Sequence, residues 1–199
     1  VRGVHSATVD LNAADVAAEL AGVASEELGL VDILVCNLDF RIDAPIADGD
    51  DDALKALIQR RDERVAGICE RILPLMKNSP AGRIIALGLN RSLFAVDGND
   101  GYARSEATLA RLVRKLAAET AEFGINVNYI QPGAIMTPSS RRVFNNDKTL
   151  RDYCIARSAA KRLGEPVDIA KVVLFLATDD SVFVSGTGIV ADGGVAADH

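Results

Sequence analysis

Short apolar runs alternate along the chain with longer stretches whose apolar residues recur every three or four positions. The runs at 31–37, 82–89 and 125–133 are continuously apolar at their centres, which is typical of strands in a parallel sheet covered on both faces. Shorter runs at 5–11 and 187–194 predict two further strands. The alternation of strands with helices predicts an α/β domain whose sheet is mostly parallel.

The longer stretches predict amphipathic helices, because their apolar residues fall on one face at 3.6 residues per turn. In residues 101–120 that face consists of Leu109, Leu112, Val113 and Leu116. The predicted helices cover residues 13–28, 52–76, 101–120 and 167–178.

Residues 136–164 interrupt this alternation with a polar stretch that follows the end of a predicted strand. Ligands bind at the carboxyl ends of strands in open α/β sheets, so a mobile substrate loop is one interpretation. A surface insertion explains the segment equally well. The whole chain, 1–199, is predicted to form one domain, since it carries no repeats or low-complexity linkers.

Composition narrows the possible partners and the compartment. A chain of 199 residues can bury a sizeable core, and its net charge of −6 argues against binding to nucleic acid or an anionic membrane. It has no apolar run of eighteen residues, which argues against a membrane span. No secretory signal pattern opens the sequence, so a cytoplasmic location is expected.

The cysteines and histidines of the sequence argue against a metal site. Cys36, Cys69 and Cys154 are odd in number and lack metal-ligand spacing, so they are interpreted as reduced thiols. The only histidines are His5 and His199, which argues against a histidine-based metal site and a Ser-His-Asp triad.

Four blocks together resemble, in order, the short-chain dehydrogenase/reductase family over nearly the whole chain. They are VDILVCN, GRIIALG, GYARSEATLARLVRKLAAETAEFGINVNYIQPGAIMTP and KRLGEPVDIAKVVLFLATDDSVFVSGTGIVADGG. The resemblance implies a Rossmann-like sheet and a nicotinamide cofactor, NAD or NADP. It also implies hydride transfer to or from a carbonyl or alcohol, and assembly into dimers or tetramers.

The glycine-rich turn with which the family opens, of the type TGxxxGIG, has no counterpart in this sequence. In the family that turn holds the cofactor pyrophosphate at a helix N-terminus. The resemblance starts near the family's third strand, which leaves about fifty residues of the family layout unmatched. Either a segment outside this sequence completes the sheet, or the N-terminal strands are rearranged.

The resemblance places four residues near the adenine and ribose of a cofactor. Asp10 matches an aspartate near the adenine, and Asn37 retains one residue of the family's Asn-Asn-Ala-Gly. Leu38 and Asp39 follow, and they would bring bulk and charge close to the ribose.

The segment PGAIMT resembles the part of the family that lines the nicotinamide. Its matching residues are Pro132, Gly133, Ile135 and Thr137. The alternative is structural, because Pro-Gly ends a strand and a threonine commonly caps the next helix. Both interpretations stay open at this point.

The catalytic positions of the family are largely changed. The tyrosine is present as Tyr102, but the lysine position four residues later is Glu106. The serine position is Leu89 and the asparagine position is Arg61. Ser92 could replace the serine only if the intervening loop were shortened.

These changes matter because the family's tyrosine transfers a proton, for which its phenol pKa of about 10 has to fall. The family's lysine stabilises the phenolate and holds the nicotinamide ribose. Glu106 shares a helix face with Tyr102, and at ~5 Å and a dielectric of ~20 its carboxylate opposes the phenolate by about 3 kcal/mol. Arg104 is predicted to point to the other side of the helix, and Leu89 offers no donor to an oxyanion.

The leading hypothesis is a catalytically degenerate member that acts by association. In the family, the helices matching 52–76 and 102–122 pair with their copies on a neighbouring subunit, so charged residues at Leu112 and Leu116 should break the assembly. The chain would be a structural or regulatory partner of an active NAD(P)-dependent alcohol dehydrogenase. The family includes such active–inactive pairs, for example in acyl-CoA-linked alcohol oxidation.

Two alternatives stay open. An active NAD(P)-dependent oxidoreductase interconverting a secondary alcohol and a ketone would need a glycine-rich segment, Ser92 as the catalytic serine and a cation near Tyr102. A binding protein could instead use the old pocket for another small molecule. No metal is expected in any of the three.

Overall fold

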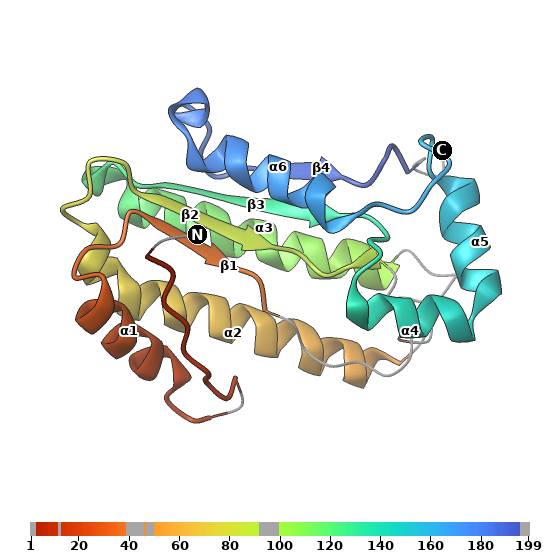
Figure 1. The fold of residues 1–199 in the computed structure, drawn as a ribbon, viewed down its shortest axis with the longest axis horizontal. Coiled ribbons are helices and arrows are strands. Elements are labelled where there is room, and N and C mark those ends of the chain that lie inside the picture. The colour runs from red at the N-terminus through yellow and green to blue at the C-terminus, as the bar shows by residue number, and fades with distance from the viewer. Residues whose placement is uncertain (1–2, 12, 39–45, 47–49, 92–99, 196–199) are drawn as a thin grey trace.

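Four parallel strands form the sheet of this computed structural model, in the order β1-β2-β3-β4 (Figure 1). The structure describes residues 3–11, 13–38, 46, 50–91 and 100–195. Neighbouring strands pair in parallel throughout, with Val35 opposite Ile85 and Ile85 opposite Asn128. The strands are β1 (Ile33–Cys36), β2 (Arg83–Leu87), β3 (Asn126–Pro132) and β4 (Gly188–Ala191).

Helices connect the strands and cover both faces of the sheet. The N-terminal half contains α1 (Val16–Glu27), α2 (Asp51–Met76), α3 (Asp100–Thr120) and the short 3₁₀ helix η2 (Ala121–Phe123). The C-terminal half contains α4 (Pro138–Asn146), α5 (Lys148–Arg157), α6 (Pro166–Ala177) and the 3₁₀ helix η3 (Asp179–Ser181).

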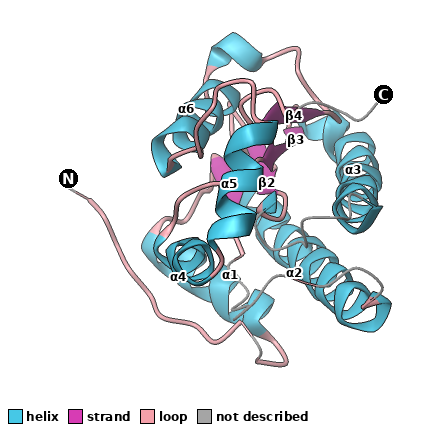
Figure 2. Ribbon diagram, turned by 90° about the vertical axis from the view of Figure 1, so that its right-hand side faces the viewer, coloured by secondary structure: helices cyan, strands magenta, loops and turns pink. Residues whose placement is uncertain are grey.

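The sheet separates two apolar cores, as Figure 2 shows with α6 on one side of the strands and α2 and α3 on the other. Alternation along β2 sends Ile84 into the core beneath α1, α2 and α3, and Ile85 into the core beneath α6. Leu109 and Val113 of α3 are fully buried in the first core. Each such side chain contributes about 1.5–3 kcal/mol to folding, which ties α3 firmly to the sheet.

The predicted apolar face of α3 is confirmed as a core-facing surface. Besides Leu109 and Val113, Leu112 and Leu116 are half-buried and pack against the same core. The helix is followed by η2 and by Gly124, whose φ of 68° turns the chain back toward β3. A residue with a Cβ is strained at that φ, so glycine suits the turn.

The predicted α/β architecture is confirmed, but the strand expected at 5–11 is wrong. Residues 5–10 are irregular and mostly exposed. A strand needs a neighbour for its backbone N–H and C=O groups, and the described chain places β1 at the edge of the sheet with β2 as its partner. The segment pairs with none of the four strands of the described chain, although its sequence alternates as a strand does.

Residues 136–164, interpreted from the sequence as a substrate loop or a surface insertion, contain the helices α4 and α5 at the carboxyl end of the sheet (Figure 1). Thr137 begins α4 with a capping box: its hydroxyl accepts from the Ser140 N–H at 3.1 Å, and the Ser140 hydroxyl accepts from the Thr137 N–H at 2.8 Å. Pro138 occupies the first turn, where a missing N–H has no consequence. Within the described residues, no helix combines the length and apolar character needed to cross a membrane.

Candidate functional site

A cleft of about 650 Å³ opens at the carboxyl ends of β1, β2 and β3. Its walls are mostly aliphatic, with polar groups from asparagine, serine and threonine side chains at the strand ends. This is the edge of the sheet at which α/β proteins bind ligands. Residues lining it include Asn37, Leu38, Leu89, Pro132, Ile135 and Thr137.

The cleft brings together four of the residues predicted to contact a cofactor, namely Asn37, Pro132, Ile135 and Thr137. Asp10 is exposed on the segment that precedes α1 and is not part of the cleft wall. Asp39 and Ser92 lie outside the described residues. Thr137 both lines the cleft and caps α4, so the two interpretations of this residue are compatible.

Gly133 supports the site through its backbone. A Cβ at this position would lie 2.6 Å from the Cα of Asp192, so the ends of β3 and β4 approach too closely for any side chain there. The Gly133 N–H donates to the carbonyl of Ala191 at 3.1 Å, and the Gly133 carbonyl accepts from the Arg91 N–H at 3.3 Å. The glycine therefore holds together the end of β3, the end of β4 and the segment that follows β2.

The hydroxyl of Tyr102 donates a hydrogen bond to the backbone carbonyl of Pro132 at 3.0 Å. Its ring packs against the small apolar cluster of Leu54, Leu57 and Leu89. Leu89 thus places an aliphatic side chain against the tyrosine at the position where the resemblance expects a serine hydroxyl.

The environment opposes ionisation of Tyr102. Burial raises the pKa of its phenol well above the ordinary value of 10, and the negative charges of Glu106 and Asp192 raise it further. The positive charge of Arg91 acts in the other direction. The repulsion by Glu106 that the sequence predicts is present, but burial is the larger cause.

Glu106 is buried, with 3% of its surface exposed. Its Oε1 accepts from the Leu89 N–H at 3.3 Å and from the Ser105 hydroxyl at 3.4 Å, and lies 3.7 Å from Nη1 of Arg61. Burial raises the pKa of this carboxyl to about 7, while the Arg61 charge and the Leu89 N–H limit the rise. Its Oε2 is buried without a hydrogen-bond partner among the described residues.

Gly88 makes room for this carboxylate, because a Cβ there would lie 2.5 Å from Oε2 of Glu106 and 2.7 Å from Oε1. Gly88 also lines the cleft, so the carboxylate of Glu106 lies directly behind the cleft wall. The sequence alone offered no sign that Gly88 and Glu106 meet.

Arg61, at the position where the resemblance expects a catalytic asparagine, is 1% exposed. Its guanidinium donates to the Ser105 hydroxyl at 3.0 Å, to the Ser105 carbonyl at 2.7 Å and to the Thr108 hydroxyl at 3.1 Å. On its other side Nε donates to Asp62 at 2.8 Å. With these bonds Arg61 fastens α2 to α3, which is a structural use of the position.

Arg91 is a residue that the sequence analysis missed. Its guanidinium carbon lies 5.3 Å from the centre of the Tyr102 ring, which makes it a cation beside the tyrosine. Arg104, by contrast, is exposed and pairs with Asp51 at 2.9 Å. The signal for Arg91 was its place just after β2, at the ligand-binding edge of the sheet.

The described residues fit part of a nicotinamide cofactor and conflict with another part. The cleft has the volume to hold a nicotinamide. Asn37 and residues of the 132–137 segment line it, as the resemblance implies for a nicotinamide cofactor. Glu106 provides no cation for a ribose because its side chain is acidic. Its carboxylate is buried, where it accepts from the Leu89 N–H and faces Arg61. Within the described chain no group of three or more His, Cys, Asp or Glu side chains could hold a metal ion.

Comparison with protein families matches residues 2–196 to a family model described as enoyl-(acyl carrier protein) reductase. A 3-oxoacyl-[acyl-carrier-protein] reductase of Mycobacterium tuberculosis is 26% identical over 198 residues, covering 100% of this chain and 79% of that protein. A 2-(R)-hydroxypropyl-CoM dehydrogenase of Xanthobacter autotrophicus is 30% identical over 182 residues, covering 90% and 72%.

Solved structures of similar proteins share the fold of this chain. A short-chain dehydrogenase/reductase from Burkholderia xenovorans superposes with a TM-score of 0.76 at 28% identity, covering 96% of this chain and 75% of that one. A gluconate 5-dehydrogenase from Burkholderia cenocepacia, solved in complex with NADP and tartrate, gives a TM-score of 0.75 at 26% identity, with 94% and 73% covered.

Proposed function

The chain belongs to the short-chain dehydrogenase/reductase family, and we propose that it is a member without catalytic activity of its own. It acts as a structural or regulatory partner of an active NAD(P)-dependent alcohol dehydrogenase subunit. By analogy with active–inactive pairs in the family, acyl-CoA-linked alcohol oxidation is one setting for such a complex.

The observation that carries this proposal is the use made of Arg61 and Glu106. Both residues are almost fully buried, and both are engaged between α2 and α3. A group that stabilises a phenolate has to be positive and close to it. Glu106 is acidic and Arg61 is held by Ser105 and Thr108, so neither position supplies that group to Tyr102.

Tyr102 itself is engaged in the fold. Its hydroxyl donates to the Pro132 carbonyl, and its pKa is raised by burial, so it is a poor proton acceptor near neutral pH. Leu89 adds no donor for a developing oxyanion. Of the four family roles, the described residues support none at its usual position.

Association is the part of the proposal that gives the chain a role. The outer faces of α2 and α3, residues 52–76 and 102–122 in the sequence prediction, are one candidate surface. A second is the exposed apolar surface formed by α6 and the residues that follow η3, which we call the α6 face. It consists of Val167, Leu174, Phe175, Val182 and Phe183.

A second candidate function is an active NAD(P)-dependent oxidoreductase, and one observation favours it. The guanidinium of Arg91 lies over the Tyr102 ring and lowers the pKa of the phenol, so it supplies a cation that the lysine position lacks. The cleft of about 650 Å³ leaves space for a ligand beside Pro132 and Ile135. Burial of Tyr102 still outweighs the Arg91 charge, which is why this function ranks second.

The deciding experiment is a calorimetric titration of the purified protein with NAD⁺, NADH, NADP⁺ and NADPH. The proposal expects no binding by the folded protein and co-purification of an active family member from the native host. Micromolar binding of one dinucleotide, together with turnover by the isolated chain, would overturn it in favour of the second function. Circular dichroism of the same sample confirms that the protein is folded.

A further inference from the structure

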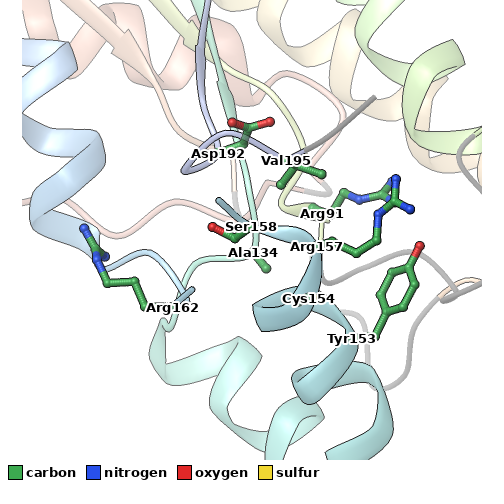
Figure 3. A pocket seen from close by; sticks show the side chains of 9 residues that line it. All are labelled: Arg91, Ala134, Tyr153, Cys154, Arg157, Ser158, Arg162, Asp192 and Val195. Atoms are coloured by element: carbon green, nitrogen blue, oxygen red, sulfur yellow. The ribbon is translucent and has the colours of Figure 1, made fainter. Parts of the chain in front are cut away.

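A small pocket lies between α5, the end of β4 and Arg91, next to the turn that follows β3 (Figure 3). Consecutive residues serve different sites here, since Asn90 lines the large cleft and Arg91 lines this pocket. Its volume is about 10 Å³, which admits one water-sized group. The pocket can therefore hold the end of a ligand, while the rest of the ligand stays outside.

Arg91 lines the pocket with a hydrogen-bond donor that has no acceptor among the described residues. It is 8% exposed, and its Nη1 is buried without a hydrogen-bond partner in the described part of the chain. Its guanidinium carbon lies 5.3 Å from the centre of the Tyr102 ring, and this contact leaves Nη1 without a hydrogen-bond acceptor within the described chain. A guanidinium stays charged at every physiological pH, so burying it without a hydrogen-bonded anion is unfavourable.

Three further charged side chains line the pocket, namely Arg157, Arg162 and Asp192. Arg157 lines the pocket with its guanidinium 5.9 Å from the Tyr153 ring. Arg162 is bound by both oxygens of Asp168, at 2.7 and 3.1 Å. The carboxylate on the wall belongs to Asp192, whose Oδ1 accepts from the Gly194 N–H at 2.8 Å.

We propose that this pocket binds an oxyanion, the carboxylate or phosphate end group of a small molecule, with Arg91 as its main ligand. Figure 3 shows the Arg91 and Arg157 side chains reaching the same side of the pocket, with the Tyr153 hydroxyl directed toward them. The unsatisfied Nη1 of Arg91 can donate a charge-assisted hydrogen bond to one oxygen of such a group. Arg91 and Arg157 together supply the positive charge.

The body of the ligand has a place next to this pocket. An adjoining pocket of about 170 Å³ shares Ala134, Arg162 and Asp192 with it and is bordered by Gly164 and Gly193. The pair of pockets suits a small organic acid or phosphate ester. The inference holds whether the chain is a catalyst or a non-catalytic partner, because it concerns binding alone.

The test is isothermal titration of the purified full chain with inorganic phosphate and, separately, with acetate, in a chloride-free buffer at constant ionic strength. One anion is expected per chain, and Arg91→Gln is expected to weaken binding by about tenfold or more, since it removes a charge-assisted contact. Arg151→Gln is the matched control: Arg151 lies on α5, the helix that carries Arg157, pairs with Asp152 at 2.8 Å and should leave binding unchanged.

Preference for phosphate or for acetate identifies the end group, and both outcomes support the site. Absence of saturable binding with either anion, or equal binding by the wild type and Arg91→Gln, overturns it. If circular dichroism shows that Arg91→Gln does not fold, Arg157→Gln takes its place with the same expected loss. Dinucleotide titration and partner capture test the proposed function, and anion titration tests this site. A negative result in one of these measurements therefore does not affect the other proposal.

Discussion

At the scale of single residues, the main change is where the positive charge lies. The family has a lysine one turn after its tyrosine, on the tyrosine's own helix. In this chain the lysine position is Glu106, and the cation that faces its carboxylate is Arg61 of α2, at 3.7 Å. The Arg61 guanidinium is bonded to Ser105 and Thr108, so it serves the packing of two helices and not the Tyr102 phenol.

Glu106 predicts a pH dependence of stability. Its pKa rises from 4.5 to about 7 on folding, so between these values the folded state binds more protons than the unfolded state. The stabilisation is complete below pH 4.5 and is lost as pH rises through about 7, a change on the order of 3 kcal/mol. Urea unfolding at pH 5 and pH 8 should therefore show a larger fall in stability for the wild type than for Glu106→Gln. Exposed Glu119→Gln serves as control, and a pH profile of Glu106→Gln identical to wild type would contradict the assignment.

Tyr102→Phe separates a structural tyrosine from a catalytic one. Loss of the hydroxyl leaves the Pro132 carbonyl without this donor, which should lower the free energy of unfolding by about 1 kcal/mol. The dehydrogenase rate of a complex with an active partner should stay nearly unchanged. A large loss of rate with stability preserved would show that the phenol takes part in the reaction.

At the scale of elements, one buried polar side chain of α2 reaches across to α3. Arg61 reaches from α2 to the hydroxyl and carbonyl of Ser105 and to Thr108, all on α3. A second arginine also links these helices, since Arg104 of α3 pairs with Asp51 of α2 at 2.9 Å, but that pair is exposed. The two links differ in burial and should differ in energy.

Arg61→Met is expected to lower the free energy of unfolding by about 3–5 kcal/mol, because it strands Glu106 and the Ser105 carbonyl in a buried site. Arg104→Met, which breaks the exposed link between the same two helices, should change it by at most about 1 kcal/mol. Chemical denaturation of both variants provides the comparison. Equal effects would mean that the buried network contributes little beyond the surface pair.

At the scale of the whole molecule, apolar side chains are exposed mainly on the α6 face and along the edge strand β1. Phe183 is 101% exposed and Leu174 is 64% exposed, and on β1 Ile33 and Val35 are more than 40% exposed. Exposed apolar patches of this kind mark interaction surfaces in many proteins. By contrast, Leu112 and Leu116 pack against the chain's own core, so charges there would disturb the fold before any assembly.

Association is therefore better tested at exposed positions, one on each candidate surface. Ala107→Arg alters the outer face of α3, and Leu174→Arg alters the α6 face. Because both side chains are exposed, stability should change by less than about 0.5 kcal/mol. Analytical ultracentrifugation is expected to show a smaller assembly for the variant whose surface forms the interface. An unchanged assembly in both variants would contradict association through either surface.

The sequence by itself determined the α/β architecture, the order of helices and strands from 13 onward apart from α4 and α5, and the positions at which this chain departs from its family. Apolar periodicity is a local property, so it predicts β1, α2 and α3 to within a few residues. Tertiary structure decided the rest, because partners are set by packing between distant segments. The segment 5–11, expected as a strand, joins no strand of the sheet, the carboxylate of Glu106 lies against Gly88, and the Arg91 guanidinium lies over the ring of Tyr102. Burial also shifted the pKa values of Glu106 and Tyr102, since desolvation depends on the whole surrounding fold.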